Sequence, residues 1–179
     1  MGRGLVSPTL TYGSAYSGID TFAAGVEMAL GCNWRYMFGS ELNGRRRDGL
    51  LAAWSCRGLT SGSCFDDSEC AAAVGAQVVD LWVSTPGCEA HSKRNHLRDD
   101  DIQRGSLGGV WRSLEYVRQK MPRVVVVENV AERSMVGAMT GMLSRLDGYT
   151  LETGDFDPPT LVAAPVSRER QFWLLVRRD

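Results

Sequence analysis

The chain has 179 residues, of which 44% are hydrophobic and 23% charged, a balance typical of a globular protein and not of a disordered or fibrous one. A formal net charge of −1 excludes a global basic field, so any contact with nucleic acid must rest on a local patch or on a partner. No apolar run approaches the roughly 18 residues of a membrane span, and the first residues lack the apolar core of an export signal. We therefore expect one domain over residues 1–179, in the cytoplasm and without membrane contact.

The first half of the chain alternates β-rich runs with helical patterns. A strand is expected at 10–16, and an apolar helix face then recurs every four positions, at Phe22, Val26 and Leu30. An aromatic-rich strand follows around Tyr36-Met37-Phe38, and a basic helical segment around 45–54. The next apolar run, VVDLWVS at 78–84, predicts a strand covered on both faces.

The same alternation continues in the second half. A helix face is formed by Leu107, Trp111, Leu114, Val117 and Met121, and Pro122 ends it. RVVVV at 123–127 is the strongest signal for a buried strand. A further helix face follows at Met135, Met139, Met142 and Leu146, and 171–176 is expected as a closing strand. This alternation predicts an α/β fold with a doubly wound, mainly parallel sheet, whose ligands bind beyond the carboxyl ends of the strands.

Polar and glycine residues follow these strands. The turn Tyr16-Ser17-Gly18-Ile19-Asp20 opens a helix, so backbone N–H groups could approach a ligand there, although a plain strand-to-helix turn with Asp20 as N-cap explains it equally well. Glu41 lies where doubly wound folds bind a ribose diol, but alone it would pass for a solvated carboxylate. Glu128 ends the buried RVVVV strand and is a candidate acid or base.

Cys88 follows the strand at 78–84, behind Pro86 and Gly87. Most cysteines are small hydrophobic core residues, but this one is followed by charged and polar side chains that would favour its nucleophilic thiolate. A hydrolase pair with His91 is weakly supported, because no third orienting group is apparent.

The five cysteines of the chain are Cys32, Cys56, Cys64, Cys70 and Cys88. An odd number without an export signal favours reduced thiols over a disulfide framework. A zinc module from Cys56, Cys64 and Cys70, with Cys32, lacks any CxxC pair, so we expect no metal.

Taken in order, these segments resemble the C5-cytosine DNA methyltransferases, which use S-adenosylmethionine. YSGIDTFAAGVE (16–27) is similar to their glycine-rich cofactor loop, with Asp20 and Thr21 where glycines are usual. TPGCEAHS (85–92) resembles the nucleophile loop, with Gly87 replacing the proline before the cysteine. The other matching segments are FGSELN at 38–43, the run at 104–130 that ends in ENV, and SRERQFWLLVRR at 167–178, with Val166 at the usual glutamine position.

The resemblance implies a Rossmann-like class I methyltransferase core with S-adenosylmethionine as cofactor. It places around that cofactor Tyr16, Ser17, Gly18, Ile19, Asp20, Glu41, Leu42, Asp66, Asp67 and Pro86. Within this set Glu41 would bind the ribose, Leu42 would lie against the adenine, and Asp66 or Asp67 would reach the adenine amino group. The implied activity is that of a DNA (cytosine-5-)-methyltransferase.

The implied reaction needs a nucleophile, because C5 of cytosine attacks carbon poorly. Cys88 would add to C6 and activate C5. Glu128 would hydrogen-bond N3 and the amino group of the base, Arg170 would contact O2 and a nearby phosphate, and Arg168 would support the loop or the backbone. In a duplex the cytosine must first be flipped out.

The resemblance also predicts an absence. The family's target-recognition domain and last motif have no counterpart in 1–179, so the domain alone should hold DNA weakly and in a salt-dependent way. The candidate DNA patch consists of Arg45, Arg46, Arg47, Lys93, Arg94, Arg98, Arg168 and Arg170, although solvation alone explains the 45–47 run. We expect a prokaryotic, viral or phage-encoded protein.

Other functions stay open. The chain could be a regulatory relative without catalysis, although such a module would need none of Cys88, Glu128 and Arg170. It could be the catalytic half of a split enzyme, completed by a separate recognition subunit or by a second copy. It could also act on RNA or on a free cytidine nucleotide.

Overall fold

The computed structural model describes residues 9–66, 70–87, 100–156 and 169–179. The strands are β1 (Leu10–Ala15), β2 (Trp34–Ser40), β3 (Cys64–Phe65), β4 (Leu81–Ser84), β5 (Val124–Val130), β6 (Tyr149–Phe156) and β7 (Arg170–Arg177). The helices are α1 (Thr21–Leu30), α2 (Gly44–Trp54), α3 (Asp100–Lys120) and α4 (Arg133–Leu143), with short 3₁₀ turns at Ser55–Arg57 and Ser61–Ser63.

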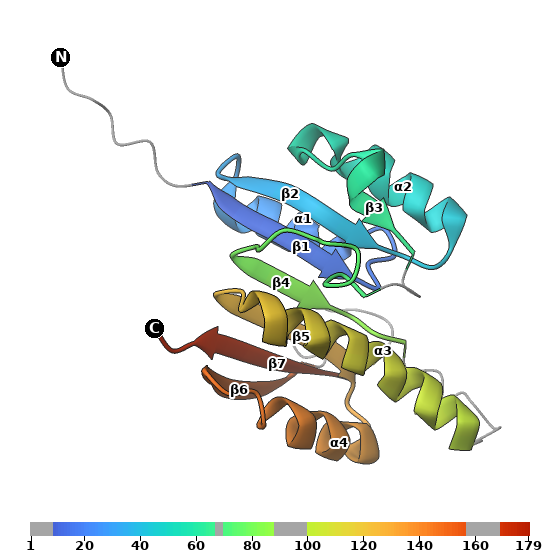
Figure 1. Ribbon diagram of the computed structural model, residues 1–179, viewed down its shortest axis with the longest axis vertical. Coiled ribbons are helices and arrows are strands. Elements are labelled where there is room, and N and C mark those ends of the chain that lie inside the picture. Colours follow the sequence, from blue (N-terminus) through green and yellow to red (C-terminus); the bar gives the residue numbers. More distant parts are fainter. Residues whose placement is uncertain (1–8, 67–69, 88–99, 157–168) are drawn as a thin grey trace.

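The strands form a seven-stranded sheet in the order β3-β2-β1-β4-β5-β7-β6 (Figure 1). The five strands from β3 to β5 in this order pair in parallel, and β7 runs antiparallel between β5 and β6. The chain starts in the middle of the sheet at β1, winds outward to β3, and returns to β4 on the other side of β1. This confirms the doubly wound, mainly parallel sheet predicted from the sequence.

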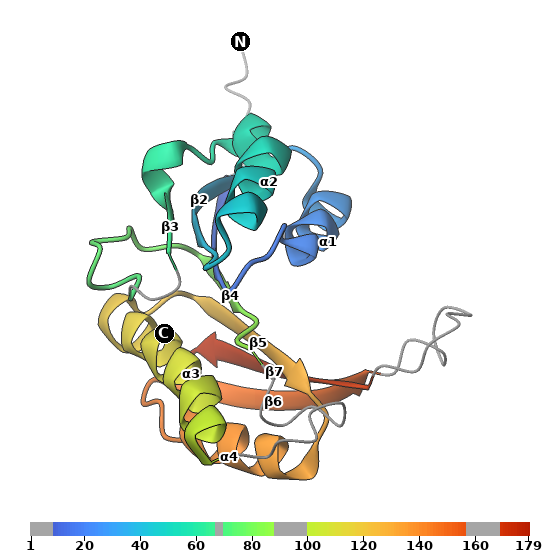
Figure 2. The same cartoon turned by 90° about the vertical axis from the view of Figure 1, so that its right-hand side faces the viewer.

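Helices cover both faces of the sheet. α1 and α2 lie on one face over a core that includes Tyr12, Tyr36 and Val83, and α3 and α4 lie on the other face over a larger core around Trp82 and Trp173. Figures 1 and 2 show these two layers from perpendicular directions. Because side chains alternate along a strand, neighbours such as Trp82 and Val83 belong to different cores.

Side-chain caps fix the helix starts. Asp20 accepts a hydrogen bond from the Ala23 N–H at α1, Asn43 accepts one from Arg46 at α2, and Glu132 accepts from the first turn of α4. The C-terminal end of α3 is also fixed locally. The helix ends at Lys120, and it is followed by Met121, which has a φ of 49°, and by Pro122.

The structure differs from the predicted elements in a few places. The run at 78–84 contributes only Leu81–Ser84 to a strand, while β5 continues past 127 to Val130. The face of α1 predicted to be buried is only partly so, since Val26 is buried but Leu30 is 37% exposed. The edge strands β3 and β6 were not predicted.

Candidate functional site

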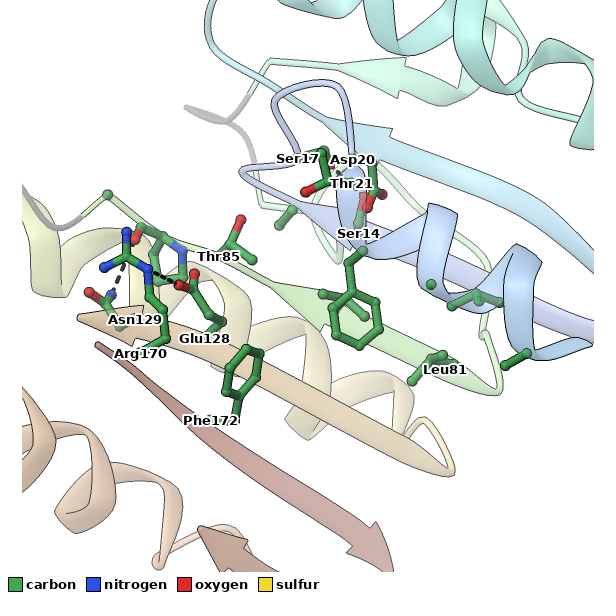
Figure 3. Close-up of a pocket in the computed structure, with 18 of the residues that line it drawn as sticks. Ser14, Ser17, Asp20, Thr21, Leu81, Thr85, Glu128, Asn129, Arg170 and Phe172 are labelled. Carbon is green, nitrogen blue, oxygen red and sulfur yellow. Dashed lines mark hydrogen bonds and ion pairs between the residues drawn. The ribbon is translucent and has the colours of Figure 1, made fainter. Parts of the chain in front are cut away.

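A pocket of about 960 Å³ opens at the carboxyl ends of β1, β4 and β5 and continues along α1 (Figure 3). Its polar lining comes from the loops and strand ends, and its apolar lining comes from α1, β4 and β7. The residues that line it are Ser14, Ala15, Ser17, Asp20, Thr21, Phe22, Gly25, Val26, Ala29, Leu30, Leu81, Val83, Thr85, Pro86, Gly87, Glu128, Asn129, Val130, Arg170 and Phe172. A mostly apolar cleft with a few converging polar groups, in this position, is typical of a ligand site.

Strand alternation explains why the central strands deliver these side chains to one face. In β5, Val125 and Val127 pack into the core beneath α3 and α4, so Glu128 and Val130 face the pocket. In β7, Trp173 and Leu175 enter that same core, and Phe172 points the other way. The burial of β5 therefore alternates between buried and half-buried positions, and its half-buried side includes the residues that line the pocket.

Glu128 and Arg170 form an ion pair at this edge of the sheet. The Arg170 Nε lies 2.6 Å from the Glu128 Oε1, and the two side chains are 15% and 22% exposed. Because β7 is antiparallel to β5, its first residue lies at the last residues of β5, with Val130 opposite Arg170 and Glu128 opposite Phe172. Two of the predicted catalytic residues are thus brought together on one pocket wall, as Figure 3 shows.

The loop after β4 is held from both neighbouring strands. On the β1 side, the Thr85 hydroxyl donates to the Tyr16 carbonyl at 2.9 Å. On the β5 side, the Asn129 amide donates to the Pro86 carbonyl at 3.2 Å, and its carbonyl oxygen accepts from the Val130 N–H. Asn129 is only 2% exposed, so these bonds are shielded from water and fix the path of the loop up to Gly87.

Backbone conformation shapes the loop after β1. Tyr16, Gly18 and Asp20 have φ values of 59°, 58° and 56°, in the left-handed region that residues other than glycine seldom adopt. The Tyr16 ring leaves the pocket side and packs toward α3, where its hydroxyl donates to the Gly109 carbonyl at 3.0 Å. A contact of Tyr16 with the cofactor, if formed as predicted, would therefore use its backbone.

Asp20 is buried beneath this loop, at 3% exposure. Its carboxylate accepts hydrogen bonds from the Ala23 N–H at 3.0 Å, from the Tyr12 hydroxyl at 2.9 Å and from the Tyr36 hydroxyl. Burial, and then the charge of Asp20, raise the pKa of both tyrosines well above the ordinary value, so their hydroxyls stay protonated as donors. Asp20, where the family usually has glycine, thus organises the loop from below.

Glu41, directly after β2, links two loops. One carboxylate oxygen accepts from the Gly18 N–H and the other from the Asn43 N–H, both at 2.8 Å, and the residue is 6% exposed. Its predicted contact with a ribose stays a prediction, and that contact would use the lone pairs that these two bonds leave over.

Three other predicted cofactor residues lie in the segments that follow β1, β2 and β3. Ile19 and Leu42 are 56% and 64% exposed, and Asp66 pairs with Arg47 at 3.3 Å. Arg47 also donates to the carbonyls of Glu41 and Leu42. Its guanidinium therefore holds the turn after β2, and the DNA-binding role considered for the 45–47 run stays a prediction. The apolar exposure of Ile19 and Leu42 fits a flat aromatic ligand group, although neither lines the pocket.

Several predicted residues lie outside the described part of the chain. They are Asp67, Cys88, His91, Lys93, Arg94, Arg98 and Arg168. Gly87, which immediately precedes Cys88, lines the pocket. The roles of Cys88 and Arg168 stay predictions.

Within the described residues, no group of three or more His, Cys, Asp or Glu side chains could hold a metal ion. The zinc alternative therefore gains no support from Cys32, Cys56, Cys64 and Cys70, which are free thiols. No helix in the described ranges is both long and apolar enough to cross a membrane.

Sequence reasoning missed the supporting residues of the site. Ser14, Thr85 and Phe172 line the pocket, and Asn129 holds the loop, but no role had been assigned to any of them. A signal was present for Asn129, because a polar residue directly after RVVVV must find partners at the end of a buried strand. The partner is the Pro86 carbonyl in the loop after β4, which is 43 residues away in the sequence, so the residues around Asn129 do not identify it.

Comparisons with known proteins agree with this architecture. No protein-family model and no curated protein matches the sequence. Among solved structures, the chain is similar to the Dnmt2 methyltransferase of S. pombe, with a TM-score of 0.61 and 18% identity over 94% of this chain and 49% of that one. It is also similar to a putative DNA modification methyltransferase of an E. coli prophage (TM-score 0.64, 14% identity, 94% and 47% coverage) and to the Entamoeba histolytica methyltransferase EhMeth (0.65, 13%, 97% and 54%).

The strand order, the antiparallel β7 and these similarities define a Rossmann-like class I methyltransferase fold. At identities of 13–18% the similarity establishes the fold and leaves the activity to be argued from the site. The chain spans about half the length of these solved structures.

Proposed function

We propose that this chain is a methyltransferase that uses S-adenosylmethionine to methylate C5 of cytosine, with DNA as the substrate. The observation that carries the proposal is the Glu128–Arg170 pair on the wall of the large pocket, beside the fixed loop that leads through Gly87 to Cys88. A carboxylate and a guanidinium held side by side match the donors and acceptors on the edge of a cytosine ring. The similarity in fold to the prophage and Dnmt2 methyltransferases supports the choice of methyl transfer.

The described residues fit the proposed cofactor. A pocket of about 960 Å³ can hold a nucleoside with an amino-acid tail, and its polar groups gather in the loop after β1. Ser17 and Pro86 line this pocket and would flank the tail. Glu41, Ile19 and Leu42 lie outside the lining, in the loops after β1 and β2, and would meet the nucleoside where it extends toward these loops. S-adenosylmethionine, when bound, supplies an activated methyl group.

In the proposed reaction the Cys88 thiolate adds to C6, so that a C–S bond forms and the ring electrons move to C5. Glu128 accepts a hydrogen bond from the exocyclic amino group of the base and also hydrogen-bonds N3, which stabilises the charge that develops on the ring. Arg170 donates a hydrogen bond to O2. C5 would then attack the methyl group, whose bond to the sulfonium sulfur would break so that S-adenosylhomocysteine leaves. The C5 proton would pass to a base such as solvent water, and the thiolate would leave as the C5–C6 double bond re-forms. No residue is assigned to this deprotonation, and Arg168 is proposed to support the loop.

The test is incubation of the protein with labelled S-adenosylmethionine and, separately, with DNA, RNA or cytidine nucleotides, followed by digestion and detection of 5-methylcytosine. We expect label in DNA, none with Cys88→Ala, and normal transfer with Cys56→Ala, a matched removal of an exposed thiol.

Label that survives Cys88→Ala would overturn the covalent mechanism. Label in RNA or in nucleotides alone would replace the substrate. Transfer that appears only when a second chain is added would assign the chain to a split enzyme, and cofactor binding without transfer to any substrate, with or without that chain, would assign it a regulatory role.

A further inference from the structure

A chain of hydroxyl groups runs from the buried carboxylate of Asp20 to the pocket. The Tyr36 hydroxyl donates to the Asp20 Oδ2, the Ser14 Oγ lies 2.5 Å from the Tyr36 hydroxyl oxygen, and the Ser17 Oγ lies 2.5 Å from the Ser14 Oγ. Tyr36 and Ser14 are 0% and 1% exposed, whereas Ser17 is half-buried and lines the pocket (Figure 3).

The carboxylate sets the direction of every bond in this chain. A hydroxyl carries one proton, and a carboxylate only accepts. The Tyr36 proton is committed to Asp20, so the bond between Ser14 and Tyr36 must use the Ser14 proton. The bond between Ser14 and Ser17 must then use the Ser17 proton. Ser14 also lies near Tyr12 and opposes the rise of its pKa, but the Tyr12 hydroxyl directs its own proton to Asp20.

Ser17 therefore presents its lone pairs, and not its proton, to the pocket. Among the described residues no arginine or lysine forms an ion pair with Asp20, so its buried negative charge also favours a cation at this end of the pocket. A carboxylate ligand group at the Ser17 hydroxyl would meet lone pairs and a like charge, whereas an ammonium group would donate to the hydroxyl and be attracted by that charge.

We propose that the Ser17 hydroxyl, oriented by Ser14, Tyr36 and Asp20, binds the ammonium group of the cofactor's amino-acid tail and selects for it. This inference rests on the proposed cofactor. It adds a recognition element that depends on Asp20, the residue at which the chain departs from the glycine-rich loop it resembles.

The test measures binding of two ligands by calorimetry: S-adenosylhomocysteine, whose only cationic group is its ammonium, and its analogue in which hydrogen replaces the amino group. We expect the wild-type protein to prefer S-adenosylhomocysteine by about 10- to 100-fold, as for a hydrogen bond to a charged group. With the double substitution Ser14→Ala/Tyr36→Phe the Ser17 hydroxyl loses both acceptors of its proton, Ser14 and Tyr36, so it becomes free to turn that proton outward, and the preference should fall to about threefold or less. Ser17→Ala should give the same loss.

Tyr12→Phe is the matched control, because it removes another buried tyrosine hydroxyl that donates to the same carboxylate. It should keep the wild-type preference, and thermal unfolding of each variant in the absence of ligand separates a loss of recognition from a loss of fold. Equal preference in the wild type, Ser14→Ala/Tyr36→Phe and Ser17→Ala proteins would overturn the inference while leaving the cofactor in place. Failure of the folded wild-type protein to bind either ligand would overturn the proposed function, and the inference with it.

Discussion

Two carboxylates with different tasks lie at opposite ends of the central strands. Glu128 lies near the end of β5 at the pocket, where Arg170 pairs with it. Asp80 precedes β4 at the other end, where one of its oxygens accepts from both the backbone N–H and the hydroxyl of Thr11, at 2.9 and 2.6 Å. The first charge is available to a ligand, and the second joins the starts of two adjacent strands.

Glu128→Gln tests the first of these tasks. The amide retains the size of the side chain but loses the negative charge, so it can neither pair with Arg170 nor stabilise charge on the base. We expect methyl transfer to fall by about 100-fold or more, as for the loss of a group that acts in the transition state. The measurement is the rate of label transfer to DNA, with Glu152→Gln on the exposed side of β6 as the control. A rate within about threefold of wild type would remove Glu128 from the chemistry.

Asp80→Asn tests the second task through pH. Burial, the largest influence, raises the pKa of Asp80, but the hydrogen bonds from Thr11 and the charge of Arg123 outweigh it, and the pKa is lowered. A carboxyl group with a lowered folded-state pKa stabilises the fold above its unfolded value of about 3.9, and that stability is lost as the pH falls through the folded value.

We therefore expect Asp80→Asn to lower the free energy of unfolding by about 1 kcal/mol at pH 7, with the difference narrowing below about pH 4. Urea denaturation at several pH values measures it, and Asp147→Asn, at an exposed position, should change little. A difference that stays constant down to pH 3 would contradict the assignment.

At the scale of elements, α3 and the loop after β1 meet at Gly109, which follows a second glycine, Gly108. A Cβ added at Gly109 would lie 2.9 Å from the Tyr16 hydroxyl oxygen and 3.0 Å from its Cζ, whereas a Cβ at Gly108 would meet nothing within 4 Å. Gly109 thus permits the contact that holds Tyr16, and Gly108 contributes only backbone freedom to the helix.

The two glycines make a matched pair of variants. Gly108→Ala should raise the free energy of unfolding by about 0.5–1 kcal/mol through helix propensity. Gly109→Ala gains the same propensity but must displace Tyr16, so we expect a net loss of about 1–2 kcal/mol. Chemical denaturation of both variants measures these changes, and stabilisation by both would show that the contact between Tyr16 and α3 does not constrain the helix.

Elements with a strong local signal were predicted well, and the edge strands were not. RVVVV and LWVS are apolar enough to identify β5 and β4 without any partner. β6 reads YTLETGDF, in which polar residues outnumber apolar ones, and it becomes a strand because β7 pairs with it along its whole length. β3 has two residues and exists only through its pairing with β2.

At the scale of the whole molecule, the sheet brings together what the sequence keeps far apart. The sequence predicted that the residues after the strands would share one edge, and Ser17, Pro86, Glu128 and Arg170 do line one pocket. It could not predict that Asp20 would be buried, because this depends on hydroxyls supplied by Tyr12 in β1 and Tyr36 in β2. Hydrogen bonds between distant segments leave no periodic signal, whereas the strands and helices that carry them do.

The insertion of β7 between β5 and β6 also has a consequence in time. The ribosome synthesises β1, β4 and β5 before Arg170. A nascent chain can therefore contain the loop after β1 and Glu128 before it contains the guanidinium that pairs with Glu128. The pair forms only when the last strand docks antiparallel along β5 and completes the sheet. The Glu128–Arg170 side of the pocket is therefore complete only once β7 has joined the sheet.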